Sequence, residues 1–242
     1  TELGRVVSSV PDGCCAKAVV DSSIRLANAD WLWDSLGTLE LDSETGIIGG
    51  CILDRQGNVQ SVGYYAGLEG LAATPNHGQP QGVVYGQLAY IRRSVTAVYG
   101  GLMVVRPEVF EKAGPLHDVD SDDGVYGIEF CLRAARHGFR SAYSPRLKAV
   151  HDSGLPRRPG IGHPLRGHLR ITYPELAATD PYYSALLGNS SATFGTRVWD
   201  ESLPENATSP LLYKLVRGTA SVAYRTRDTA KQVVRRAMQI VS

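Results

Sequence analysis

The stretch "GIEFCLRAARHGFRSAYSPRLKAVHDSG", residues 127–154, contains a helix, the end of that helix and the strand that follows it. Its first half carries apolar residues at the i, i+3, i+4 and i+7 spacing of one helix face: Ile128, Cys131, Leu132 and Ala135. Gly138 is typical of the residue that follows the end of a helix. The segments "RSAYSP" and "LKAVH" then have strand character and finish at His151. The stretch therefore predicts a helix–strand unit with a histidine at the strand end.

The preceding chain alternates strands and helices in the same way. Strands are expected at residues 16–23, 46–54, 58–67 and 94–106, helices at 29–39 and 107–114, and loops at 68–90 and 153–172. Gly100 and Gly101 interrupt the last of these strands, and glycines inside a strand mark a bulge or the close approach of a ligand. The alternation predicts an α/β fold with its site at the carboxyl ends of strands.

Composition is that of an ordinary globular protein, with 43% hydrophobic and 20% charged residues among 242. The 25 basic and 24 acidic residues nearly cancel, so overall charge does not indicate a nucleic-acid partner, and none is expected. No apolar run reaches the roughly 18 residues of a membrane span. Four cysteines lack metal-ligand spacing, and three fall in segments expected to be core, which favours a reducing, cytoplasmic location.

The C-terminal segment differs from the rest of the chain. Residues 211–242 hold seven basic residues and one acid, with two apolar stripes at helical spacing. This pattern predicts basic amphipathic helices that pack on the main domain, on a second copy of the chain, or on the anionic inner face of the cell membrane. We therefore expect a main domain at residues 1–205 and a helical tail at 206–242.

Three stretches, in this order, resemble family 2 glycosyltransferases of the GT-A fold. The first is "VVDSSIRLANADWLWDSL" (19–36), which is similar to a strand ending in the family's Asp-x-Asp motif. The second joins "GGCILDRQGNVQSVGYYAGLEG" (49–70) to "VTAVYGGLMVVRPEVFEKAGPLHD" (95–118), and the third is the opening stretch. A later "TDPYYSALL" (179–187) resembles a "DPyYnpnL" segment. The likeness is greatest to bacterial enzymes that add rhamnosyl or galactofuranosyl sugars to surface polysaccharides.

The resemblance implies a GT-A-like mixed sheet flanked by helices and a specific chemistry. A sugar would move from a nucleotide-sugar donor to a carbohydrate or lipid-linked acceptor. Mg²⁺ or Mn²⁺, held by hard oxygen ligands and often a histidine, would neutralise the leaving diphosphate. A carboxylate at the start of the helix near residue 127 would remove the proton of the acceptor hydroxyl.

Residue by residue, the resemblance assigns Asp21 and His151 to the metal. The alternatives are that Asp21 is a turn acid at a strand end and that His151 is a structural histidine. The second acid of Asp-x-Asp falls on Ser23, which is a poor metal ligand. In the helix motif the second acid falls on Glu129, whereas the first, which usually acts as the base, falls on Gly127.

Other residues are candidates with a second interpretation beside each. Asp122 and Asp123 stand just upstream of Gly127 and are candidates for the missing base, or belong to a solvated acidic loop. Glu129 also lies four residues before Arg133, so an exposed ion pair on the helix is the alternative to catalysis.

Four further residues are candidates for donor or acceptor binding together with Arg133. Gly100 and Gly101 would form a wall beside the sugar, or a bulge alone. Arg157 and Arg158 would clamp a phosphate, or lie in a solvated loop.

These departures leave two functions open. The first is an active, metal-dependent glycosyltransferase. The second is a catalytically degenerate module of the same fold that binds glycan or assembles with an active partner. Only twenty residues precede Asp21, whereas the family has a nucleotide-binding part before Asp-x-Asp, so we expect an N-terminally incomplete domain.

Overall fold

The computed structural model describes residues 14–68, 72–83, 85–116, 125–153, 165–174, 180–184 and 187. The strands are β1 (Lys17–Val20), β2 (Ile24–Leu26), β3 (Thr45–Leu53), β4 (Val59–Ser61), β5 (Tyr65–Ala66), β6 (Ala72–Ala73), β7 (Arg93–Val95), β8 (Leu102–Val105) and β9 (Arg140–His151). The helices are α2 (Trp31–Leu41), α3 (Pro107–Ala113), α4 (Val125–Arg136) and α5 (Leu165–Thr172), with the 3₁₀ turns η2 (Gln81–Val83) and η3 (Tyr85–Tyr90). The predicted α/β class is confirmed.

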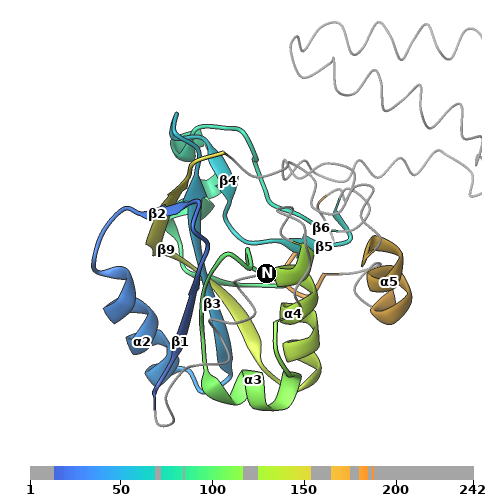
Figure 1. The fold of residues 1–242 in the computed structure, drawn as a ribbon. Coiled ribbons are helices and arrows are strands. Elements are labelled where there is room, and N and C mark those ends of the chain that lie inside the picture. Colours follow the sequence, from blue (N-terminus) through green and yellow to red (C-terminus); the bar gives the residue numbers. More distant parts are fainter. Residues whose placement is uncertain are drawn as a thin grey trace, which may run out of the picture. The chain divides into compact units, whose positions relative to one another are not determined.

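The main sheet is mixed, with the strand order β1-β8-β3-β9-β2. Its β3 and β9 run parallel to each other, whereas β8 is antiparallel to both β1 and β3. β4 also pairs with β3, and β7 with β9, while β5 and β6 form a separate two-stranded sheet. Figure 1 shows α2 on one side of the main sheet and α3 and α4 on the other. The sheet is therefore the middle of three layers.

The centre of the sheet is β3, whose nine residues are all buried. A strand covered on both faces needs a nearly continuous apolar run, which "TGIIGGCIL" provides. Its partner β9 contains a bulge, because Ser144 lies opposite Gly50 and Lys148 lies opposite Cys51. A Cβ on Gly50 would collide with the carbonyl oxygen of Leu147, so the glycine is what admits the bulge.

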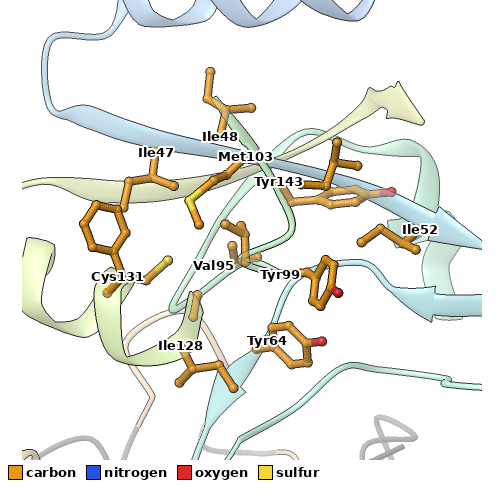
Figure 2. Packing of buried hydrophobic residues seen from close by; sticks show 14 of the residues in the cluster. Ile47, Ile48, Ile52, Tyr64, Val95, Tyr99, Met103, Ile128, Cys131 and Tyr143 are labelled. Atoms are coloured by element: carbon orange, nitrogen blue, oxygen red, sulfur yellow. The ribbon is translucent and has the colours of Figure 1, made fainter. Parts of the chain in front are cut away.

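The predicted helix near residue 127 is confirmed as α4. Ile128, Cys131 and Leu132 are buried as expected, but the stripe continues through Ala134, and Ala135 is exposed. Figure 2 shows Ile128 and Cys131 of the helix in one cluster with residues of β3, β7, β8 and β9, labelled Ile47, Val95, Met103 and Tyr143. Gly138 follows the helix with a φ of +85°, the left-handed geometry expected of a residue after a helix end.

Four of the predicted elements are wrong at least in part. The strand expected at 58–67 is two strands, β4 and β5, which belong to different sheets, and the loop expected at 68–90 contains β6, η2 and η3. The strand expected at 94–106 is two strands, β7 and β8, which pair with different neighbours and are separated by residues 96–101. Part of the loop expected at 153–172 is a helix, α5.

The structure also bears on the cysteines and on the tail. Cys51 and Cys131 are buried, Cys14 is half-buried and Cys15 is exposed, and all four are free thiols.

The boundary at 205 and the tail at 206–242 lie outside the described residues. Within the described part of the chain, no helix has the length and apolar character needed to cross a bilayer.

Candidate functional site

Asp21 and His151, which lie 130 positions apart in the sequence, meet through Ser23. The amide and the hydroxyl of Ser23 donate hydrogen bonds of 2.7 and 2.5 Å to Oδ1 of Asp21. The hydroxyl oxygen of Ser23 also lies 3.0 Å from Nε2 of His151. The imidazole is only 4% exposed. The structure thus brings the two predicted metal ligands together, with the unexpected serine between them.

The sheet explains this meeting. His151 is the last residue of β9 and lies opposite Ile24, the first residue of β2. The amide of Asp21, directly after β1, donates 2.7 Å to the carbonyl of Gly101, directly before β8. Residues 21–23 therefore connect the strands at the two ends of the strand order, and their side chains lie where several strands end.

The hydrogen bond from Ser23 to Asp21 limits the protonation states of His151 that allow a hydrogen bond to Ser23. A serine hydroxyl has one proton, and Ser23 donates it in a hydrogen bond to the carboxylate of Asp21. The contact between Ser23 and His151 therefore requires a proton on Nε2 of the imidazole. On the other side of the ring, Nδ1 lies 3.4 Å from the hydroxyl of Ser153. The result is a short chain of hydrogen bonds in which His151 donates to Ser23 and Ser23 donates to the carboxylate of Asp21.

Gly101 and Tyr99 line the same cluster. A Cβ on Gly101 would lie 2.9 Å from Cβ of Asp21 and 2.5 Å from the ring of Tyr99. The Tyr99 ring packs edge-on against the His151 ring, with 6.0 Å between the centroids. Only glycine leaves room here, so Gly101 is needed for the aspartate and the tyrosine to lie this close.

Gly100 occupies a second close approach, to the start of α4. A Cβ on Gly100 would lie 2.8 Å from Cα of Gly127, and a Cβ on Gly127 would lie 2.5 Å from Cα of Gly100. The Tyr126 ring also covers Gly100. Position 127, where the resemblance places the base, is therefore closed by backbone, and a carboxylate there would displace the loop.

Glu129 and Arg133 form the ion pair that is the alternative to catalysis, but its acid is buried and its arginine is only partly exposed. Nε and one terminal nitrogen of Arg133 each lie 3.0 Å from a carboxylate oxygen of Glu129, which is 5% exposed. Arg133 also donates to the carbonyls of Ala113 and Pro115, and the Tyr173 hydroxyl donates to Glu129 at 3.4 Å. Burial and the charge of Glu129 raise the pKa of Tyr173. These contacts tie α4 to the end of α3 and to the residue after α5.

The structure brings together Asp21, His151, Gly100 and Gly101, whereas the hydrogen bonds of Glu129 described above run to Arg133 and Tyr173 and not to that group. Asp122, Asp123, Arg157 and Arg158 lie outside the described residues. Within the described ranges, no three His, Cys, Asp or Glu side chains gather as a metal-ligand set. The described donors for a cation are therefore one carboxylate, one imidazole and one hydroxyl.

Sequence reasoning missed the parts played by Ser23, Tyr99 and Asp180. The sequence marks Ser23 only as a poor metal ligand, although its place two residues after Asp21 suits a hydrogen bond from the backbone of Ser23 to the side chain of Asp21. Tyr99 directly precedes the glycine pair. An aromatic residue beside two glycines could have indicated a ring that packs against backbone without side chains. Asp180 lies in the segment that resembles "DPyYnpnL", and its aromatic neighbours Tyr182 and Tyr183 are the signal that could have indicated a buried carboxylate.

No family model matches the chain. The chain is 26% identical over 144 residues to the O-antigen biosynthesis protein RfbC of Myxococcus xanthus, a match that covers 57% of this chain and 11% of that protein. It is also 22% identical over 141 residues to the uncharacterized protein y4gI of Sinorhizobium fredii, which covers 58% of this chain and 15% of that protein. The chain therefore spans only a small part of the length of both relatives.

Proposed function

We propose that this chain forms part of a glycosyltransferase that moves a sugar from a nucleotide-sugar donor to a carbohydrate or lipid-linked acceptor in surface polysaccharide synthesis. The partial likeness to a protein named for O-antigen biosynthesis supports a role in making polysaccharide. The observation that carries the proposal is the hydrogen-bonded cluster of Asp21, Ser23 and His151 at the strand ends. A site at the carboxyl ends of strands is the usual place for ligands in an open α/β sheet.

The residues present fit a divalent cation whose other ligands come from the substrate. Mg²⁺ is commonly bound by one or two carboxylates together with phosphate oxygens and water. Asp21 would supply an oxygen ligand and His151 a nitrogen once Nε2 has lost its proton, while Ser23 holds the Asp21 carboxylate in place. Such an ion supplies charge neutralisation of the leaving diphosphate. The chain's own contribution is to hold the three side chains in register through β1, β2 and β9.

The direct test is calorimetric titration of the full-length protein with nucleoside diphosphates in the presence of Mn²⁺. We expect saturable binding that Asp21→Asn and His151→Ala each weaken by about tenfold or more, as loss of a metal ligand or its partner does. Asp54→Asn is the matched control, because Asp54 is a hydrogen-bonded carboxylate in the turn between β3 and β4. Absence of binding to every nucleoside diphosphate tested would contradict the proposal.

A specific observation favours a second function, a binding or assembly module that has lost catalysis. Gly127 has no side chain and no room for one, and both oxygens of Glu129 are held by Arg133. Neither position offers a carboxylate ready to accept a proton from an acceptor hydroxyl. Asp122 and Asp123 remain the candidate bases.

An assay of sugar transfer separates the two functions. In an active enzyme, one of Asp122→Asn and Asp123→Asn should reduce turnover by about a hundredfold or more, the usual contribution of a general base. In a degenerate module, donor and acceptor glycans bind but no transfer is detected, and both substitutions leave binding unchanged.

The basic segment 211–242 supports a proposal of its own, that the protein attaches to the inner face of the cell membrane. Seven basic residues beside apolar stripes suit an anionic surface. Co-sedimentation with phosphatidylglycerol vesicles, with and without this segment, tests it. Equal sedimentation of both forms would contradict attachment through the tail.

A further inference from the structure

Asp180 is a buried carboxylate that joins three parts of the chain. It is 6% exposed. Its Oδ2 accepts the amide of Ala66 in β5 at 2.5 Å and the hydroxyl of Thr96, and its Oδ1 accepts the amide of Tyr182 at 2.7 Å. A buried carboxylate without such donors would be costly, so these bonds are conditions for its being there.

A second contact holds the same segment in place. The ring of Tyr183 packs on the ring of Tyr65, with 5.4 Å between centroids, and the Tyr183 amide donates to the Asp180 carbonyl at 3.3 Å. Residues 180–184 are therefore attached both to β5 and, through Thr96, to the chain that leads out of β7.

From Thr96 a short loop runs directly to the candidate site. Ala97 and Tyr64 exchange two backbone hydrogen bonds, of 2.7 and 3.1 Å, immediately after Thr96. Figure 2 shows Tyr64 and Tyr99 within the same buried cluster. The loop then presents Tyr99 to His151, and the carbonyl of Gly101 accepts the Asp21 amide. Residues 96–101 thus have Asp180 at one end and Asp21 at the other.

We propose that Asp180 is a positioning residue, whose carboxylate fixes residues 96–101 and so holds Tyr99 and the glycine pair beside Asp21 and His151. Its role as a positioning residue rests on the proposed function, because only that function makes the cluster of Asp21 and His151 beside the loop a binding site. Asp180 acts through Thr96 and does not touch the reacting groups. Without the carboxylate, the Thr96 hydroxyl and the Ala66 amide would both be buried without that acceptor, and the loop would no longer have one preferred position.

Hydrogen exchange of the full chain, read by peptide mass spectrometry, tests the positioning directly. Thr96→Val keeps the shape of the side chain and removes only the hydroxyl. We expect amide exchange in 96–101 to accelerate about tenfold or more, as a local opening becomes easier. Thr96→Ser, which keeps the hydroxyl, should restore slow exchange. Thr45→Val is the matched control, because Thr45 is a buried threonine whose hydroxyl donates to Asp42 at 2.7 Å.

A double-mutant cycle asks whether the two side chains act as one unit. If Asp180 acts through Thr96, Asp180→Asn and Thr96→Val together should accelerate exchange in 96–101 no more than the stronger single change does. Additive effects, or exchange in 96–101 that both single changes leave at the wild-type rate, would overturn the proposal.

Ligand affinity adds a readout that general destabilisation does not move. Nucleoside-diphosphate affinity with Mn²⁺ should fall about tenfold in Thr96→Val, as it does when a partner that orients a ligand residue is removed. It should stay at the wild-type value in Thr45→Val, and an equal fall in both would count against positioning. If the wild type binds no nucleoside diphosphate, the proposed function fails, while the exchange result still decides whether Asp180 fixes the loop.

Discussion

The backbones of Gly100 and Gly127 lie directly against each other, and neither position has space for a side chain. A Cβ on Gly127 would lie 2.5 Å from Cα of Gly100 and 3.0 Å from the carbonyl oxygen of Val98. The start of α4 is thereby fixed against the loop that borders Asp21. This contact explains why the position that the resemblance assigns to a base carries glycine here.

The first prediction follows from this contact. Gly127→Ala should lower the free energy of unfolding by about 2 kcal/mol or more, because backbone has to move and not a flexible side chain. Gly37→Ala is the matched control, since Gly37 lies in the exposed part of α2 with nothing near its missing Cβ. That change should stabilise the protein by about 0.5 kcal/mol or more, because alanine is the better helix former. Urea unfolding of both variants measures the difference, and equal stability would refute the packing argument.

The second prediction concerns the missing acid at position 23. Ser23→Asp should raise Mn²⁺ affinity by about tenfold, because a second carboxylate would then stand beside Asp21 and His151. Without the ion the same variant should be less stable than the wild type, since two neighbouring carboxylates repel. The exposed neighbour offers a control in Ser22→Asp, which adds the same charge outside the hydrogen-bonded cluster. Titration calorimetry with Mn²⁺ would contradict the idea if Ser23→Asp and Ser22→Asp raised the Mn²⁺ affinity equally.

The third prediction concerns the buried ion pair. Glu129→Gln should lower the free energy of unfolding by about 2 kcal/mol, because the Arg133 guanidinium loses a charged acceptor in a buried place. Asp152→Asn weakens ion pairs with Arg25 and Arg55, two arginines whose side chains are well exposed, and should change stability by less than about 0.5 kcal/mol. An assay of sugar transfer by Glu129→Gln could contradict this structural role. A Glu129→Gln protein of wild-type stability that has lost turnover would make the carboxylate a chemical group and not a structural one.

Much of the fold, and part of the candidate site, could be predicted from the pattern of residues. The α4 stripe, the Gly138 helix end and the strand ending at His151 all follow from local spacing, which is a property of neighbouring residues. The break between β7 and β8 could not be predicted, since Gly100 and Gly101 look the same whether a strand bulges or stops. Partner choice between distant strands decides that, and single-sequence patterns do not contain it.

The chemistry of the site shows the same limit. An acid four residues before an arginine looks the same in sequence whether the acid is exposed or, like Glu129, buried. Burial came from the packing of α4 on α3 and from Tyr173, which are contacts of long sequence separation. Similarly, the bond between Ser23 and His151 depends on the register of β2 with β9.

The fourth prediction uses the cysteines as reporters. Burial raises the pKa of the Cys131 thiol to about 11, and it also raises the pKa of Cys51. Because the thiolate is the reactive form, both should resist a disulfide reagent at pH 8 until the protein unfolds, whereas the exposed Cys15 reacts at once. A variant with Cys14→Ser and Cys15→Ser should lose the fast phase entirely. A fast phase that persists in this variant would show that α4 or β3 opens in the native state.

The last prediction concerns the pH dependence of stability at Asp180. Burial raises the pKa of this carboxyl in the folded protein above its ordinary value of 3.8, against the opposing effect of its hydrogen-bond donors. Between the unfolded and the folded pKa, the folded state therefore holds more proton than the unfolded state. The contribution of Asp180 to the unfolding free energy should fall as the pH rises through that window and be level on either side of it.

Asp180→Asn removes the titration and keeps the shape, so it isolates this contribution. The stability of the wild type minus that of Asp180→Asn should be greatest below pH 4 and should shrink as the pH rises above it. Urea unfolding of both proteins at intervals of half a pH unit measures this difference. If the difference grows with pH instead, the donors from Ala66, Thr96 and Tyr182 stabilise the carboxylate by more than burial destabilises it. The group would then titrate below its ordinary value, and the prediction would be wrong in sign.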